Sequence, residues 1–294
     1  MAFIKHRFGK TCYTKKGRQG KTPIVWLHGG PGGEHRPDSE VFRLADDRLV
    51  YCYTQIGSGR SSKTSARYWN IETFVEELHL LIKAWGLKEF HLMGGSWGTT
   101  LALEYYLRKD YTVKDKTKRK IKSLVFQSPL FSAKDWKADG VKLIKAMPKN
   151  TQKVINTCHE IGATDSAVYQ KAMFEYYLKH VLRNKSKLKE MFSRSNPNGA
   201  LIYQTMWGPS EFEPTGTLKR YSRLKALEKI DVPTMILCGE FDEARPETGM
   251  KYANQIPACH FAEIKGASHG IWIEKPAKMK KLISDFLSQI DGCG

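Results

Sequence analysis

The segment Gly94–Gly98 (GGSWG) constrains this chain more than any other, because it stands between an apolar run and a helical pattern. The run Phe90–Met93 predicts a buried strand, and residues 99–108 predict a helix. Glycines beside Ser96 permit a turn so sharp that larger flanking side chains would clash with neighbouring strands. The pattern therefore predicts a serine nucleophile at the top of a sheet, above the N-terminus of a helix. The alternative is a glycine-rich turn with a capping serine.

Strand-like and helix-like segments alternate in the first and last parts of the chain. Short apolar runs predict strands at 23–27, 48–53, 90–93, 123–127, 234–239 and 260–265. Helical spacing predicts helices at 71–85, 99–108, 247–255 and 276–289. Such alternation is typical of an α/β fold with a mostly parallel sheet covered by helices on both faces.

The middle of the chain is helical and poor in strands, with helices expected at 151–161 and 166–182 and a breaker cluster at 196–199. We therefore expect an α/β core made of residues 1–128 and 221–294, interrupted by a helical insert at 129–220. Residues 1–13 have room for one or two additional strands of the core sheet.

Composition excludes several classes of protein. Of 294 residues, 41% are hydrophobic, which is enough for a core and excludes general disorder. No apolar run approaches the roughly 18 residues of a membrane span, and no secretory signal is visible, so we expect a cytoplasmic protein. The net charge of +18 includes basic runs at 114–122 and 179–189. Without a nucleic-acid-binding motif, this charge indicates a lysine-rich surface rather than nucleic-acid binding.

The six cysteines, Cys293 among them, are scattered without a CxxC pair. This spacing predicts neither a metal site nor a disulfide framework.

A second glycine-rich segment, His28–Gly33 (HGGPGG), directly follows the strand expected at 23–27. Sites built on G-x-S-x-G take one oxyanion donor from the residue after the nucleophile and another from a loop of this kind. We therefore predict the backbone N–H groups of Trp97 and Gly30 as the donors. A phosphate-binding loop would instead need G-x-x-x-x-G-K-[ST] or G-x-G-x-x-G, and neither is present.

Two polar residues follow late strands: Asp242 lies after 234–239, and His269 lies after 260–265. The order Ser96, Asp242, His269 is the nucleophile–acid–base order expected with a G-x-S-x-G turn. All three positions fall at carboxyl ends of strands, where open α/β sheets place their sites. A lone histidine there is more often structural, but in this combination it predicts a catalytic triad. Such a triad needs no metal or organic cofactor.

Taken together, these segments resemble the prolyl aminopeptidase (proline iminopeptidase) family of the α/β-hydrolase superfamily. That family also contains tricorn-interacting aminopeptidase and L-amino-acid amidases. The matching segments are HGGPGG at 28–33, QIGSGRS at 55–61, GGSWGTTLALEY at 94–105, GPSEF at 208–212, GEFDEARPET at 239–248 and GASHG at 266–270. The resemblance implies an α/β-hydrolase fold with the triad Ser96, Asp242 and His269, and a helical cap over the site.

The resemblance also implies a substrate. In this family, glutamates of the cap and of a loop bind the free ammonium of the substrate's first residue, and the matching positions are Glu211 and Glu243. Opposing carboxylates offset the cost of removing an ammonium from water. The implied activity is release of an N-terminal residue, preferably proline, from a short peptide. One departure is Thr54, which stands where the family usually has a loop-organising aspartate.

Other functions remain open. An L-amino-acid amidase or an esterase could use the same triad, because a fold does not determine a substrate. Glu211 and Glu243 favour a peptide or amino-acid amide with a free amine, since a simple ester gives them no role. Glu211 by itself could also be a surface carboxylate near a turn. A non-catalytic binding protein would be marked by loss of a triad residue, and all three are present.

Overall fold

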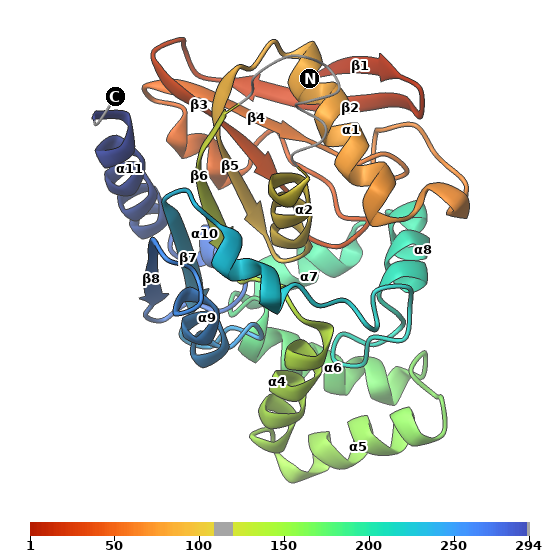
Figure 1. Cartoon of the computed structure of the whole chain (residues 1–294). Coiled ribbons are helices and arrows are strands. Elements are labelled where there is room, and N and C mark those ends of the chain that lie inside the picture. The colour runs from red at the N-terminus through yellow and green to blue at the C-terminus, as the bar shows by residue number, and fades with distance from the viewer. Residues whose placement is uncertain (109–119, 293–294) are drawn as a thin grey trace.

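The structure is a computed structural model, and it describes residues 1–108 and 120–292. Within these ranges the fold is built on an eight-stranded sheet (Figure 1). The strands are β1 (Ala2–His6), β2 (Gly9–Lys16), β3 (Lys21–Leu27), β4 (Arg48–Tyr53), β5 (Glu89–Gly95), β6 (Lys120–Gln127), β7 (Thr234–Gly239) and β8 (Cys259–Ile264). Their order is β1-β2-β4-β3-β5-β6-β7-β8. The β1–β2 and β2–β4 pairs are antiparallel, and the other five pairs are parallel. The mostly parallel sheet is confirmed, and the N-terminal residues supply two of its strands.

Helices connect and cover the strands. The α-helices are α1 (Ile71–Ala84), α2 (Trp97–Leu107), α4 (Ala133–Lys145), α5 (Lys149–Glu160), α6 (Ala167–His180), α7 (Lys185–Ser193), α8 (Pro197–Met206), α9 (Pro246–Ala253), α10 (Ile271–Glu274) and α11 (Pro276–Gly292). Short 3-10 turns are η1 (Glu40–Leu44), η2 (Ala66–Tyr68) and η3 (Leu224–Lys229). Helix α8 was not expected, since residues 196–199 read as a breaker. Asn196 instead caps α8 by accepting the Gly199 N–H at 3.1 Å, and Pro197 occupies the first turn.

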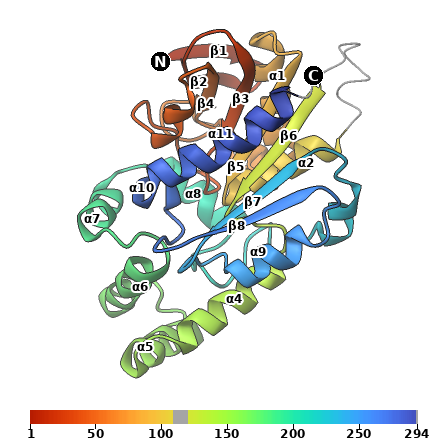
Figure 2. The ribbon, with the colours of Figure 1, turned by 90° about the vertical axis from the view of Figure 1, so that its left-hand side faces the viewer.

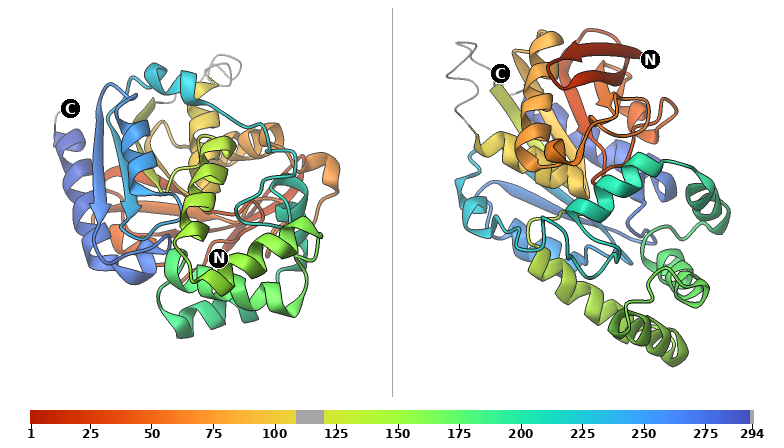
Figure 3. Two further views of the ribbon diagram at one scale, coloured as in Figure 1. Left: turned by 90° about the horizontal axis from the view of Figure 1, so that it is seen from below. Right: turned by 90° about the vertical axis from the view of Figure 1, so that its right-hand side faces the viewer.

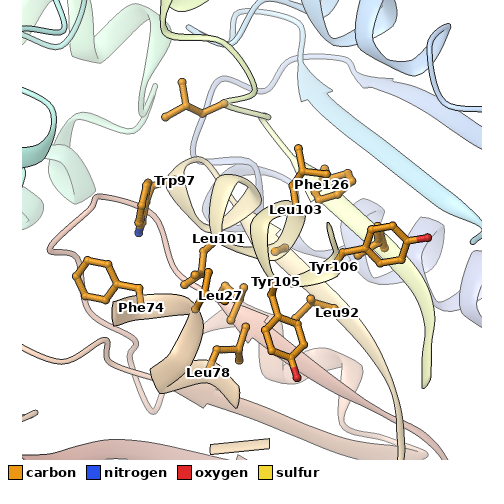
Figure 4. Close-up of a cluster of buried hydrophobic side chains, with 14 of the residues drawn as sticks. Leu27, Phe74, Leu78, Leu92, Trp97, Leu101, Leu103, Tyr105, Tyr106 and Phe126 are labelled. Carbon is orange, nitrogen blue, oxygen red and sulfur yellow. The ribbon is translucent and has the colours of Figure 1, made fainter. Parts of the chain in front are cut away.

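Both faces of the sheet carry an apolar core. Along β3, Ile24 and Trp26 pack with η1, α10 and α11, whereas Val25 and Leu27 pack with α1 and α2. This alternation follows from the two-residue period of a strand. Figure 4 shows the cluster on the α1 and α2 face, in which side chains of α2 lie among those of α1 and the sheet. The two cores hold the strands rigidly and so position the loops at the strand ends.

The helices α4 to α8 lie between β6 and β7 in the sequence; α4, α5 and α6 project at one end of the molecule, whereas α7 and α8 lie closer to the sheet (Figures 2 and 3). Residues of α4, α5 and α6, Tyr169 and Tyr176 among them, form an apolar cluster of their own together with Phe212, which follows α8. The basic run at 179–189 spans the end of α6 and the start of α7.

Two sequence features fall partly outside the described residues: positions 114–119 of the other basic run, and Cys293. The five cysteines within the described ranges are free thiols. Across these ranges, the structure contains no helix with the length and apolar character needed to cross a membrane.

Candidate active site

Ser96 occupies a strained turn between β5 and α2. Its backbone has φ 54° and ψ −124°, a left-handed conformation that is uncommon for a residue with a side chain. A Cβ added at Gly94 would lie 2.2 Å from the Gly98 carbonyl oxygen, and one added at Gly98 would lie 2.2 Å from the Leu27 carbonyl oxygen. Glycine is therefore required at both positions, and the turn presents a half-buried Ser96 at the end of the sheet.

Asp242 lies three residues beyond the end of β7, and its side chain is buried. Oδ2 accepts the Gly239 N–H at 3.1 Å and the Ser128 hydroxyl at 2.6 Å. Oδ1 accepts the Ala244 N–H at 2.9 Å and lies 2.7 Å from Nδ1 of His269. Four donors fix the orientation of this carboxylate. The proton of the imidazole is therefore on Nδ1, and Nε2 is the basic nitrogen.

His269 follows β8, and the charges of several acidic side chains act on it. Burial alone would lower the pKa of its imidazole below 6.5. The charge and hydrogen bond of Asp242 and the charges of Glu211 and Glu274 outweigh that effect, so the pKa is raised. A histidine stabilised in this way can accept a proton and hold it as a cation.

Gln127, at the end of β6, links Ser96 to His269. Its backbone carbonyl accepts the Ser96 N–H at 2.9 Å, and its side-chain amide donates to the His269 carbonyl at 2.9 Å. Among the described residues, Ser96 Oγ and His269 Nε2 make no direct hydrogen bond. Catalytic hydrogen bonds are often longer without substrate and shorten in the complex. The structure thus brings the three predicted residues to one edge of the sheet.

The glycine-rich loop after β3 begins with the buried His28. Its Nδ1–H donates to the Gly29 carbonyl at 2.7 Å, and its Nε2 accepts the Gln55 N–H at 3.0 Å. Burial lowers the pKa of His28 to about 4, so the ring is neutral. The Gln55 side chain accepts the Trp97 indole N–H at 2.9 Å. Gln55 therefore ties the loop that contains Gly30 to Trp97, although the role of their N–H groups stays a prediction.

Thr54 stands in a neutral hydrogen-bonded chain rather than an ion pair. Its hydroxyl lies 2.8 Å from Nδ1 of the buried His35, whose Nε2 lies 2.9 Å from the Thr14 hydroxyl. Burial lowers the pKa of His35 to about 4. The loop is therefore organised by uncharged partners at the position where an aspartate is usual.

The charge of Glu211 acts on Glu243, which lies beside His269. Oε2 of Glu211 accepts hydroxyl hydrogen bonds from Tyr177 at 2.9 Å and Tyr203 at 2.8 Å. Oε1 of Glu243 lies 3.8 Å from His269 Nε2, whereas its buried Oε2 has no hydrogen-bond partner among the described residues. Burial, then the charges of Glu211 and Asp242, raise the pKa of the Glu243 carboxyl well above its usual value. A buried acceptor without a donor is costly, and a cationic donor would relieve that cost.

Glu211 also borders a cavity of about 400 Å³, which is lined by Tyr177, Ala200, Tyr203, Gln204, Gly208 and Pro209. Glu211 is therefore adjacent to open space that a ligand can enter.

Sequence reasoning missed the side chains that hold these groups in place, namely Gln55, Gln127, Ser128, Tyr177, His180, Tyr203 and Glu274. For Gln127 and Ser128 a signal existed: two polar residues end the apolar run of β6, at the edge where the site lies. The others contact the site from the helical insert, from the loop after β4 or from α10, and no local pattern identifies them.

Comparison with known proteins agrees with this geometry. Residues 22–276 match the family model described as alpha/beta hydrolase fold. The chain is 38% identical to a proline iminopeptidase of Heyndrickxia coagulans over 98% of both chains, and 33% identical to one of Lactobacillus delbrueckii subsp. lactis over 92% of both. The crystal structure of a Mycobacterium smegmatis proline iminopeptidase aligns with a TM-score of 0.87, at 27% identity over 99% of both chains. The chain therefore belongs to the α/β-hydrolase family and, within it, to the proline iminopeptidase family.

Proposed function

We propose that this enzyme is a serine aminopeptidase that releases an N-terminal residue, preferably proline, from short peptides. The names of its relatives support the reaction. The observation that carries the substrate class is the pair Glu211 and Glu243, which faces the base His269 and includes a buried, unpartnered carboxylate oxygen.

In the proposed mechanism, His269 Nε2 takes the proton of the Ser96 hydroxyl as Oγ attacks the carbonyl carbon of the first residue. Asp242 holds Nδ1–H and stabilises the imidazolium that forms. The N–H groups of Gly30 and Trp97 hold the oxyanion. His269 then gives its proton to the leaving amine as the peptide bond breaks, and a water molecule hydrolyses the acyl-enzyme.

Glu211 and Glu243 select the substrate by its free N-terminus. A ligand ammonium placed between them donates charge-assisted hydrogen bonds in a site with little water. Two neighbouring carboxylates also repel each other, and a bound cation removes that repulsion. An N-blocked peptide offers no such cation. The pair therefore restricts cleavage to the first residue of the chain.

We further propose that residues 129–220 form a cap that is distinct from the core of residues 1–128 and 221–294. The apolar cluster that α4 to α6 form with Phe212 supports a separate unit. The cap contributes Glu211 and its two tyrosines, so it supplies the amine-binding part of the site. The free thiols of the described cysteines support a reducing, cytoplasmic setting.

A substrate panel tests the proposal. We expect hydrolysis of proline arylamide to exceed that of the alanine and leucine arylamides, and an N-blocked proline substrate to be left intact. An N-blocked proline substrate hydrolysed as fast as proline arylamide would contradict an aminopeptidase. So would an enzyme that hydrolyses a p-nitrophenyl ester but none of the arylamides.

A nucleophile variant tests the chemistry. Ser96→Ala removes the attacking oxygen, so it should abolish nearly all turnover and all labelling by a fluorophosphonate probe while the fold is kept. The control is Ser186→Ala: Ser186 is exposed and its hydroxyl donates to Asn184, so this variant should label as the wild type does. Persistent labelling of Ser96→Ala would refute the assignment of Ser96.

A further inference from the structure

The segment His180–Arg183, which leaves the C-terminus of α6, contacts both loops that carry the acid and the base. The backbone carbonyls of His180 and Val181 accept the N–H groups of His269 and Gly270 at 3.1 and 2.7 Å. We call this segment the cap clamp. It belongs to the helical insert in sequence, yet it holds the loop of the catalytic base.

The cap clamp also holds the loop of the catalytic acid. Nδ1 of His180 lies 2.9 Å from the carbonyl of Phe241, the residue before Asp242. The Arg183 guanidinium stacks on the Phe241 ring, with 3.9 Å from its central carbon to the ring centroid. The Arg183 N–H donates to the Glu274 carboxylate, which also accepts from Ser268. One short segment thus ties the residues beside Asp242 to those beside His269.

The chemistry of His180 determines what it can do. A carbonyl oxygen only accepts, so Nδ1 of His180 carries the proton that is donated to Phe241. The side chain is buried, and burial lowers the pKa of His180, which keeps the ring neutral. Its Nε2 is buried without a partner in the described part of the chain, and Tyr176 packs at 5.0 Å between ring centroids. A neutral ring packed in this way is a fixed donor and not a proton carrier.

We propose that His180 is a positioning residue for the reaction: it sets the separation of Asp242 and His269 by anchoring the Phe241 carbonyl. The inference rests on the proposed triad. It extends the role of the insert from amine recognition to maintenance of the acid–base pair.

The physical argument concerns alignment. Asp242 and His269 sit on loops after two adjacent strands, and their 2.7 Å contact depends on the distance between those loops. Loss of the His180 donor would leave the Phe241 carbonyl unpaired and free the Asp242 loop to move. A misplacement of about 1 Å near a reacting centre can reduce a rate about a hundredfold. It would also weaken the hold of Asp242 on the imidazolium, while Glu211, Glu243 and Glu274 would still face His269.

Two variants of His180 separate this role from general packing. His180→Leu fills the space without a donor, whereas the amide of His180→Asn offers an N–H close to the position of Nδ1. The matched control is His91→Leu. His91 is a buried histidine at the other end of β5, bonded to Ser123 at 2.7 Å and to Asp291 at 3.2 Å.

We expect His180→Leu to reduce kcat for proline arylamide and the rate of fluorophosphonate labelling ten- to a hundredfold, with little change in KM. The acid limb of its kcat/KM profile should move to lower pH, because the pKa of His269 falls when Asp242 holds it less firmly. His180→Asn should restore most of the rate and the wild-type limb. His91→Leu should lose stability and keep the wild-type limb.

An unchanged acid limb in a folded His180→Leu enzyme, with activity lost only in proportion to the unfolded fraction, would overturn the proposal. So would a His180→Asn enzyme that folds but is no more active than His180→Leu. Failure of the triad itself would appear separately, as unchanged labelling of Ser96→Ala.

Discussion

Replacing Glu211 with glutamine isolates the charge that the substrate amine is expected to bind. In the folded enzyme, Oε2 of Glu211 accepts the Tyr177 and Tyr203 hydroxyls. The amide oxygen of glutamine can accept both, so the side chain keeps its size and its two tyrosine partners. What changes is one negative charge beside the space where the amine would lie. The same argument applies to Glu243→Gln, with two differences. Its buried Oε2 has no hydrogen-bond partner among the described residues, and Glu243 is next to Asp242 in the sequence.

The magnitude follows from the kind of hydrogen bond that is lost. Hydrogen bonds to charged groups contribute about 1.5–3 kcal/mol, which corresponds to a loss in kcat/KM of about ten- to a hundred-and-fiftyfold. An upper bound is the attraction of two unit charges at about 4 Å, roughly 4 kcal/mol at an effective dielectric of 20. Glu243→Gln should fall nearer the lower end. The raised pKa of Glu243 means that a bound ammonium must first displace a proton, and this offsets part of the attraction.

The assay compares two substrates in one enzyme preparation. kcat/KM for proline arylamide should fall by the stated factor, while kcat/KM for an uncharged p-nitrophenyl ester should change little, since the triad is untouched. The control is Glu213→Gln. Glu213 is a half-exposed carboxylate two residues from Glu211 that pairs with Lys137, and its loss should affect neither substrate.

Equal losses on the arylamide and the ester would indicate damaged geometry instead of a lost charge. No loss on either substrate would refute the amine site and leave a serine hydrolase of another specificity.

Two further predictions concern pH. Because His269 must be neutral to accept a proton and its pKa is raised, kcat/KM should fall on the acid side with an apparent pKa above 6.5; a rate that is constant down to pH 5 would contradict a histidine base. Burial raises the pKa of Glu77, in α1, from 4.5 to about 8. Between these two pH values the folded state therefore binds more protons than the unfolded state. The free energy of unfolding contributed by Glu77 falls by about 1.4 kcal/mol per pH unit in that window. Glu77→Gln should remove this slope, as measured by urea unfolding at pH 5 and pH 8, and identical slopes in both proteins would refute the assignment.

The predicted positions of the nucleophile, the acid and the base follow from local sequence. A G-x-S-x-G pattern between an apolar run and a helix predicts a sharp turn, and in the structure the Gly94 and Gly98 positions admit no side chain. The alternation of apolar runs with helical spacing likewise determines a parallel sheet, and a parallel sheet gathers its strand ends at one edge. Ser96, Asp242 and His269 could therefore be predicted as a triad without any knowledge of their contacts. Glu211 and Glu243 were predicted as amine-binding residues only through resemblance, since a lone glutamate after a turn has no local signature.

The contacts that hold those residues in place were decided by tertiary structure. The Gln127 amide reaches the carbonyl of His269, 142 positions later in the chain, and His180 reaches that of Phe241, 61 positions later. Asn196 appeared as a breaker, but its side chain caps α8 and donates to the Gly32 carbonyl of the glycine-rich loop at 3.0 Å. Periodicity reports only which face of an element is apolar, over one or two turns. The partners of a buried polar group depend on how distant elements pack, because any nearby donor or acceptor can satisfy it and only the folded arrangement determines which one is near.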